Sequence, residues 1–203
     1  MVFETMIFMR LGFLVPSMAY YAKEALGAPW LTSVLLPSMS VAILLGGFFG
    51  PRYLSAFGKR RGMVIALFFT IVCFAAIPLC GNSPKFVLPL FFLANISTGV
   101  QATLSFTLVA EAVELHQVTF GVREEGLLSS TASLSQKVGF AVGSASLAYA
   151  LALTGYHPHS MQGNVRDVLT WLVSIVPAVI SMVQVVCIAF YRTERREALP
   201  ASS

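Results

Sequence analysis

The sequence predicts an all-α membrane protein, a polytopic bundle of six transmembrane helices. Three observations support this prediction. Hydrophobic residues make up 57% of the 203 residues and charged residues only 11%, whereas soluble domains carry roughly 25% charged residues. Six apolar stretches are long enough to cross a bilayer, which takes about 20 residues. Basic residues, finally, gather in alternate connections between these stretches.

The six stretches occupy most of the chain. We expect spans at about residues 2–21, 30–50, 63–80, 86–109, 127–153 and 168–191, which together form one bundle over residues 1–191, followed by a tail at 192–203. Each span must satisfy its own backbone hydrogen bonds, because lipid offers no partners, and helices do so.

Each connection between spans carries turn-forming or charged residues. In order, these are Lys23-Glu24 with Gly27-Ala28-Pro29, residues 52–61 with four basic side chains, Gly81-Asn82-Ser83-Pro84, the charged segment 111–125, and residues 154–167. Within the spans, Gly46 with Gly50 and Gly139 with Gly143 have the small-xxx-small spacing that lets helix backbones approach. Ordinary packing of the bundle explains this spacing better than dimerisation does.

The distribution of basic residues predicts the orientation. One side of the membrane receives eight (Arg52, Lys59, Arg60, Arg61, Arg123, Arg192, Arg195 and Arg196) and the other receives three (Lys23, Lys85 and Arg166). The positive-inside rule places the larger set in the cytoplasm. We therefore expect an integral protein of the plasma (inner) membrane with both termini cytoplasmic. The net charge of +4 follows from this bias, and no nucleic-acid partner is expected.

Lys137 is an ionisable residue inside the fifth span. At a period of 3.6 residues it shares a helix face with Ser130, Ser133 and Ser144. A buried charge costs roughly 3 kcal/mol or more in a membrane, so this face is expected to line a solute path. The alternative is a lysine that extends to the membrane surface.

Arg10 lies in the middle of the first span. Two interpretations stay open: it contacts a partner on another helix, or its side chain extends to the surface. Glu4 is six residues away, off the spacing of helix neighbours, so a direct pair between them is not expected.

An acidic cluster closes the fourth span. Glu111 and Glu114 lie three residues apart, on one helix face at the cytoplasmic end, where Arg123 and Lys137 could pair with them. Such a cluster suits a gate, although a solvated loop is the alternative because surface ion pairs are weak. A metal site or an acid–base set that includes His116 is disfavoured, since no further His or Cys has ligand spacing.

Four segments carry a family resemblance: Val109-Ala110-Glu111-Ala112-Val113-Glu114, Gly121-Val122-Arg123-Glu124-Glu125-Gly126-Leu127, Gln136-Lys137-Val138-Gly139 and Leu153-Thr154-Gly155-Tyr156. With these segments the chain resembles the C-terminal half of the glycoside-pentoside-hexuronide:cation symporters, the melibiose-permease-like branch of the major facilitator superfamily. The sequence departs from the family pattern at Ala102, His116 and Gln117.

The resemblance implies one six-helix half of a major-facilitator fold, with the solute bound between two halves. It implies that Lys137 lies beside the cation and sugar sites and that Ser133 lies near the substrate. Glu111 and Glu114 stand where the family has two Asp, and Arg123 and Glu125 match its loop. A coupling cation, sodium or a proton, is expected, and no other cofactor.

We therefore expect the C-terminal half of a secondary active transporter that performs cation-coupled symport of a small polar solute, a sugar or glycoside, by alternating access. Its partners would be membrane lipid and a missing N-terminal six-helix half, and it would not be an enzyme. The alternative is a truncated orphan membrane protein or assembly partner without transport of its own. The start at Met1, almost within a span, favours a fragment. An intramembrane hydrolase using Glu111, Glu114 and His116 is a more distant alternative.

Overall fold

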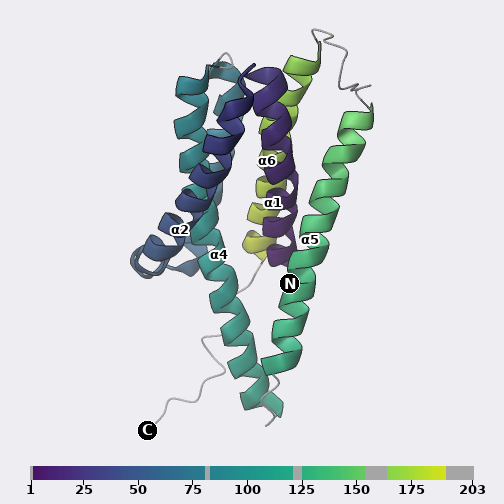
Figure 1. Ribbon diagram of the computed structural model, residues 1–203. Helices are drawn as coiled ribbons and strands as arrows, with labels where there is room; N and C mark the ends of the chain where they lie inside the picture. Colours follow the sequence, from purple (N-terminus) through teal and green to yellow (C-terminus); the bar gives the residue numbers. More distant parts are fainter. Residues whose placement is uncertain (1, 81–82, 121–124, 154–163, 191–203) are drawn as a thin grey trace.

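The computed structural model describes residues 2–80, 83–120, 125–153 and 164–190, and this part of the chain is helical except at short connections such as residues 26–28 and Gly58. The long helices stand side by side as a bundle (Figure 1). In chain order they are α1 (Val2–Tyr20), α2 (Thr32–Phe57), α3 (Lys59–Ala76), α4 (Pro84–Phe120), α5 (Glu125–Leu153) and α6 (Asn164–Phe190). Three short helical turns, η1 (Tyr21–Ala25), η2 (Pro29–Leu31) and η3 (Ile77–Cys80), extend or connect them.

Five of these helical segments are long and apolar enough to cross a membrane, by the measure of length and composition applied to the described residues. α5 has 29 residues and falls outside that set. Its serines, Gln136 and Lys137 lower its hydropathy, so the predicted fifth span is present as a helix but a polar one.

Two predicted connections are helical for much of their length. α2 continues to Phe57, through the basic residue Arg52, and α4 continues to Phe120, through Glu111. Hydropathy marks where lipid ends, whereas a helix can continue into water because its backbone bonds are internal. α2 ends where the backbone turns at Gly58, whose φ of 79° suits a residue without a Cβ.

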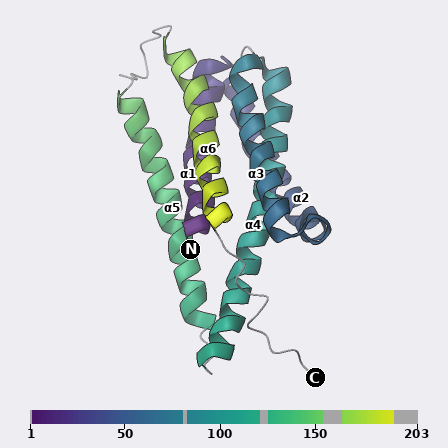
Figure 2. The same ribbon diagram turned by 180° about the vertical axis from the view of Figure 1, so that it is seen from behind.

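The helices pack in a definite arrangement. α1 contacts α5 and α6, α2 contacts α4, and α3 contacts α4 and α6. In the view from behind, α3 and α6 lie next to each other on the face toward the viewer (Figure 2). α4 and α5 extend beyond the end of α1 and meet near their tips (Figure 1).

Glycine seams hold two helix pairs at close distance. A Cβ atom at Gly139 or Gly143 on α5 would meet backbone atoms of Thr5 and Met9 on α1. A Cβ at Gly46 on α2 would likewise meet the backbone of Ile96 on α4. The predicted close approach of helix backbones at both small-xxx-small motifs is therefore confirmed.

The core has two apolar clusters with polar residues between them. One cluster contains Phe13, Phe74 and Phe91, and the other contains Met63 and Leu104 among its members. Thr70 on α3 and Asn95, Ser97 and Thr98 on α4 are buried polar side chains between the residues of the two clusters, and Gln101 lies next to them at the edge of the second cluster. This polar layer is where the candidate site lies.

Candidate functional site

Arg10 lies at the centre of the polar layer and is completely buried. Its Nη1 donates to Ser181 Oγ at 2.7 Å and to Gln184 Oε1 at 3.3 Å, both on α6. Its Nη2 donates to Thr98 Oγ1 at 3.2 Å and to Gln101 Oε1 at 2.7 Å, both on α4. The planar guanidinium thus bridges two helices at once, which its fixed geometry permits. The interpretation of Arg10 as a residue with partners on other helices is confirmed.

The acceptors of Arg10 are oriented by further hydrogen bonds. The hydroxyls of Thr98 and Ser181 donate to the carbonyls of Ala94 and Pro177 in their own helices, which leaves their oxygen lone pairs for Arg10. The amide of Gln101 donates to Thr70 Oγ1 on α3 at 3.2 Å, so its Oε1 is fixed toward the guanidinium. Side chains from four helices therefore form one network.

This network compensates the charge of Arg10 with neutral oxygens. In the part of the chain that the structure describes, Lys23–Glu24 and Lys59–Glu111 form ion pairs, and Arg10 forms none with a carboxylate there. Arg10 Nε and Gln184 Nε2 have no hydrogen-bond partner among those residues. A buried cation held only by neutral groups is costly, which marks this layer as a place with a specific role.

Sequence reasoning missed the residues that hold Arg10. Each helix offers a hydroxyl and an amide three positions apart, Thr98 with Gln101 and Ser181 with Gln184, hence on one helix face. Polar residues at this spacing inside two apolar spans were the signal that could have identified them. Knowing which helices face Arg10 required the fold.

A second polar contact joins α1 to α5. Glu4 is 2% exposed, and its Oε1 accepts a hydrogen bond from Gln136 Nε2 at 2.8 Å. Glu4 Oε2 has no partner among the described residues. As expected, Glu4 pairs with a residue other than Arg10.

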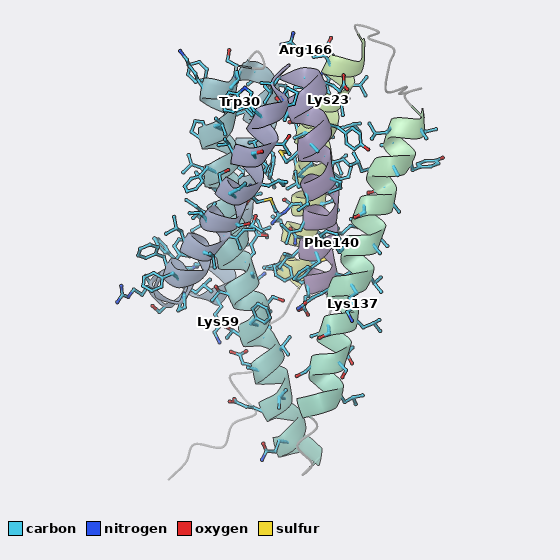
Figure 3. All side chains as sticks on the ribbon, viewed as in Figure 1. Lys23, Trp30, Lys59, Lys137, Phe140 and Arg166 are labelled. Carbon is cyan, nitrogen blue, oxygen red and sulfur yellow. The ribbon has the colours of Figure 1, made fainter. Side chains whose placement is uncertain are left out.

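Lys137, Ser133 and Ser130, predicted to line a path, are all exposed on α5. Ser144, assigned to the same face, is half-buried and donates to the carbonyl of Gly12 on α1. Lys137 follows Gln136, which contacts the first turn of α1, so it lies toward one end of the bundle and near the level of Lys59 (Figure 3). The structure thus brings the three residues together on a face of α5 that no other described helix covers.

The predicted gate residues lie near the same end. Glu111 is partly exposed and forms an ion pair with Lys59 at the start of α3, whereas the sequence had suggested Arg123 or Lys137 as its partners. Glu114 is exposed one turn further along α4. Glu125 begins α5, and Arg123 lies outside the described residues.

Within the described residues there is no group of three His, Cys, Asp or Glu side chains that could hold a metal ion. The buried polar groups are donors and acceptors of hydrogen bonds on facing helices. Such an arrangement can bind polar groups and hold helices together.

Comparison with known proteins assigns the family. The family described as "MFS/sugar transport protein", where MFS is the major facilitator superfamily, matches residues 1–195. The chain belongs to this family. As a member of the MFS/sugar transport family it is an integral membrane protein with several spans, and it is of a transporter type rather than an enzyme.

Curated relatives point to the glycoside/cation symporters within this family. The chain is 26% identical over 183 residues to the isoprimeverose transporter of Lactiplantibacillus pentosus, covering 88% of this chain and 38% of the relative. It is 27% identical over 180 residues to the "Putative glycoside/cation symporter YagG" of Escherichia coli K12, covering 85% and 38%. A stretch of 100 residues is 34% identical to the glucuronide carrier protein homolog of E. coli K12, covering 49% of this chain and 22% of that one.

The chain therefore spans about 38% of the length of two of these relatives. The comparison with solved structures found no significant match to the chain. The resemblance inferred from the segments around Glu111 and Lys137 is confirmed at the level of the family.

Proposed function

We propose that this chain acts as the C-terminal half of a secondary active transporter that couples symport of a sugar or glycoside to a cation. The observation that carries the proposal is the family match over residues 1–195. The chain covers about 38% of the length of two relatives, which supports the proposal that it functions together with an N-terminal six-helix half. The two halves would alternate in exposing a solute site between them.

Lys137, Ser133 and Ser130 would line the solute and cation pathway. Their exposure on one side of α5 supports this proposal, because a second half packed there would enclose a polar surface. Three polar side chains on one face are also poorly suited to lipid contact. Lys137 would supply a charge, and the serines would supply hydroxyl groups for a polar solute.

Glu111, Glu114, Arg123 and Glu125 would form a cytoplasmic gate. The ion pair between Lys59 and Glu111 supports a role for this end in holding helices together, since it joins the start of α3 to α4. We propose that both termini are cytoplasmic in the plasma (inner) membrane, consistent with the basic residues of the α2–α3 junction.

Transport in proteoliposomes tests the proposal. The chain is reconstituted alone and together with the N-terminal six-helix half of a related glycoside transporter, and uptake of labelled glycosides is followed under a sodium or a proton gradient. We expect gradient-driven uptake with both halves present, abolished by Lys137→Ala and retained by Lys85→Ala, which removes an exposed lysine of α4. Absence of uptake under every gradient would instead support a membrane protein without transport activity.

A further inference from the structure

The two glycine seams divide the bundle into two tightly joined helix pairs. In the α1/α5 pair, Gly12 faces the backbone of Phe140, and Gly143 faces that of Met9. In the α2/α4 pair, Gly46 and Gly99 face the opposing helix backbone in the same way. Because backbones meet directly, neither pair can change its internal spacing without losing contacts along the whole seam.

The two pairs are joined to each other by different means. α1 and α4 face each other through side chains, and the polar contact between them runs from Arg10 to Thr98 and Gln101. The same guanidinium holds Ser181 and Gln184 on α6, which also packs against α3. The Arg10 side chain thus connects the α1/α5 pair to the α2/α4 pair, and it connects both pairs to α6.

We propose that Arg10 is a positioning residue that ties the α1/α5 pair to the α2/α4 pair and sets the angle between them. In a bilayer the hydrophobic effect does not favour one angle between the pairs, because lipid is as apolar as the helices. Hydrogen bonds have directional geometry and strengthen in a low dielectric. The tie therefore fixes an arrangement that the apolar contacts would leave adjustable.

Arginine suits this role for a geometric reason. Each Nη atom carries two N–H groups. Each Nη atom donates to one hydroxyl and one amide oxygen that lie three residues apart on the same helix. A lysine ammonium is a single point with three donors and cannot serve both sets in this way. The tie depends on neither the identity of the solute nor the proposed transport function.

Distances between spin labels test the tie on the chain in nanodiscs. Cys73, Cys80 and Cys187 are first replaced by alanine. Labels at Leu44 on α2 and Tyr149 on α5, exposed by 72% and 68%, report across the two pairs. Labels at Leu44 and Phe106, the latter 60% exposed on α4, report within one pair.

We expect Arg10→Gln to at least double the width of the distance distribution across the pairs and to leave the distribution within the pair unchanged. Arg10→Lys should have an intermediate effect. The control Ser17→Ala removes a buried hydroxyl of α1 that donates to the carbonyl of Leu14 in its own helix, and should change neither distribution.

A second variant applies if Arg10→Gln fails to fold. Thr98→Val combined with Gln101→Leu removes the α4 acceptors and keeps the contacts of Arg10 with α6, and the same broadening across the pairs is expected. The proposal is overturned if the distribution across the pairs keeps its native width in the folded variant. It is equally overturned if the distribution within the pair broadens as much.

Discussion

Nη2 of Arg10 lies 2.7 Å from Oε1 of Gln101, a residue 91 positions further along the chain. The contact joins α1 to α4 in a layer enclosed by apolar clusters on either side. Because Gln101 also donates to Thr70, the arginine is connected through it to α3. A charge that would be unfavourable in lipid is in this way used to organise the bundle.

Removing this charge should destabilise the fold. Arg10→Leu leaves four buried acceptors without their donor, and an unsatisfied buried group costs about 1–3 kcal/mol in soluble proteins but less in membranes. We expect the free energy of unfolding to fall by about 2–4 kcal/mol, measured by titration with SDS in mixed micelles. The control Arg52→Leu changes an exposed arginine of α2 and should be close to neutral; equal effects would contradict the assigned role.

Adjacent glycines of α2 should respond oppositely to a methyl group. At Gly46 a Cβ would meet the backbone of Ile96, whereas at Gly47 it would meet nothing within 4 Å. Gly46→Ala should force α2 and α4 apart and destabilise the chain by about 2 kcal/mol, a typical cost of overpacking. Gly47→Ala should be neutral or stabilise by up to about 1 kcal/mol through helix propensity. Thermal unfolding followed by circular dichroism distinguishes them, and a similar response of both variants would count against the seam.

The ion pair between Lys59 and Glu111 should contribute little to stability. The side chains are 55% and 26% exposed, and exposed pairs contribute about 0.2–1 kcal/mol. A double-mutant cycle with Lys59→Met and Glu111→Gln should give a coupling in this range that decreases as salt is added. Exchange of the two charges, Lys59→Glu with Glu111→Lys, should restore part of it. A coupling that salt leaves unchanged would contradict a solvated pair.

Accessibility of position 137 tests the proposed pathway directly. In a chain whose native cysteines are replaced, Lys137→Cys should react rapidly with a water-soluble maleimide, because the position is exposed on the polar face of α5. Ala132→Cys, at a position that is 7% exposed, should react slowly. If the water-soluble maleimide fails to modify position 137 from either side of the membrane and a lipid-soluble reagent modifies it, Lys137 does not line a pathway.

Much of the fold could be predicted because a bilayer restricts the choices. Runs of apolar residues had to become helices, and each of the predicted spans overlaps a helix of the structure. The ends were less predictable. α4 runs through Glu111 to Phe120, since charge marks the membrane surface and not the end of a helix.

The site was harder to predict than the helices. Lys137 and Arg10 could be identified as unusual because each places a charge in an apolar context. Their surroundings depend on which helices face each other, which a single sequence does not specify. Arg10 is enclosed by polar side chains of other helices, whereas Lys137 lies on an open face.

The length of α4 has a mechanical consequence. Its 37 residues correspond to about 55 Å at 1.5 Å per residue, whereas the hydrocarbon layer is about 30 Å thick. The helix is therefore longer than the hydrocarbon layer is thick, and part of it projects beyond the lipid as a rigid lever. A small tilt of its buried portion, where it accepts hydrogen bonds from Arg10, would produce a larger displacement at the far end of the helix.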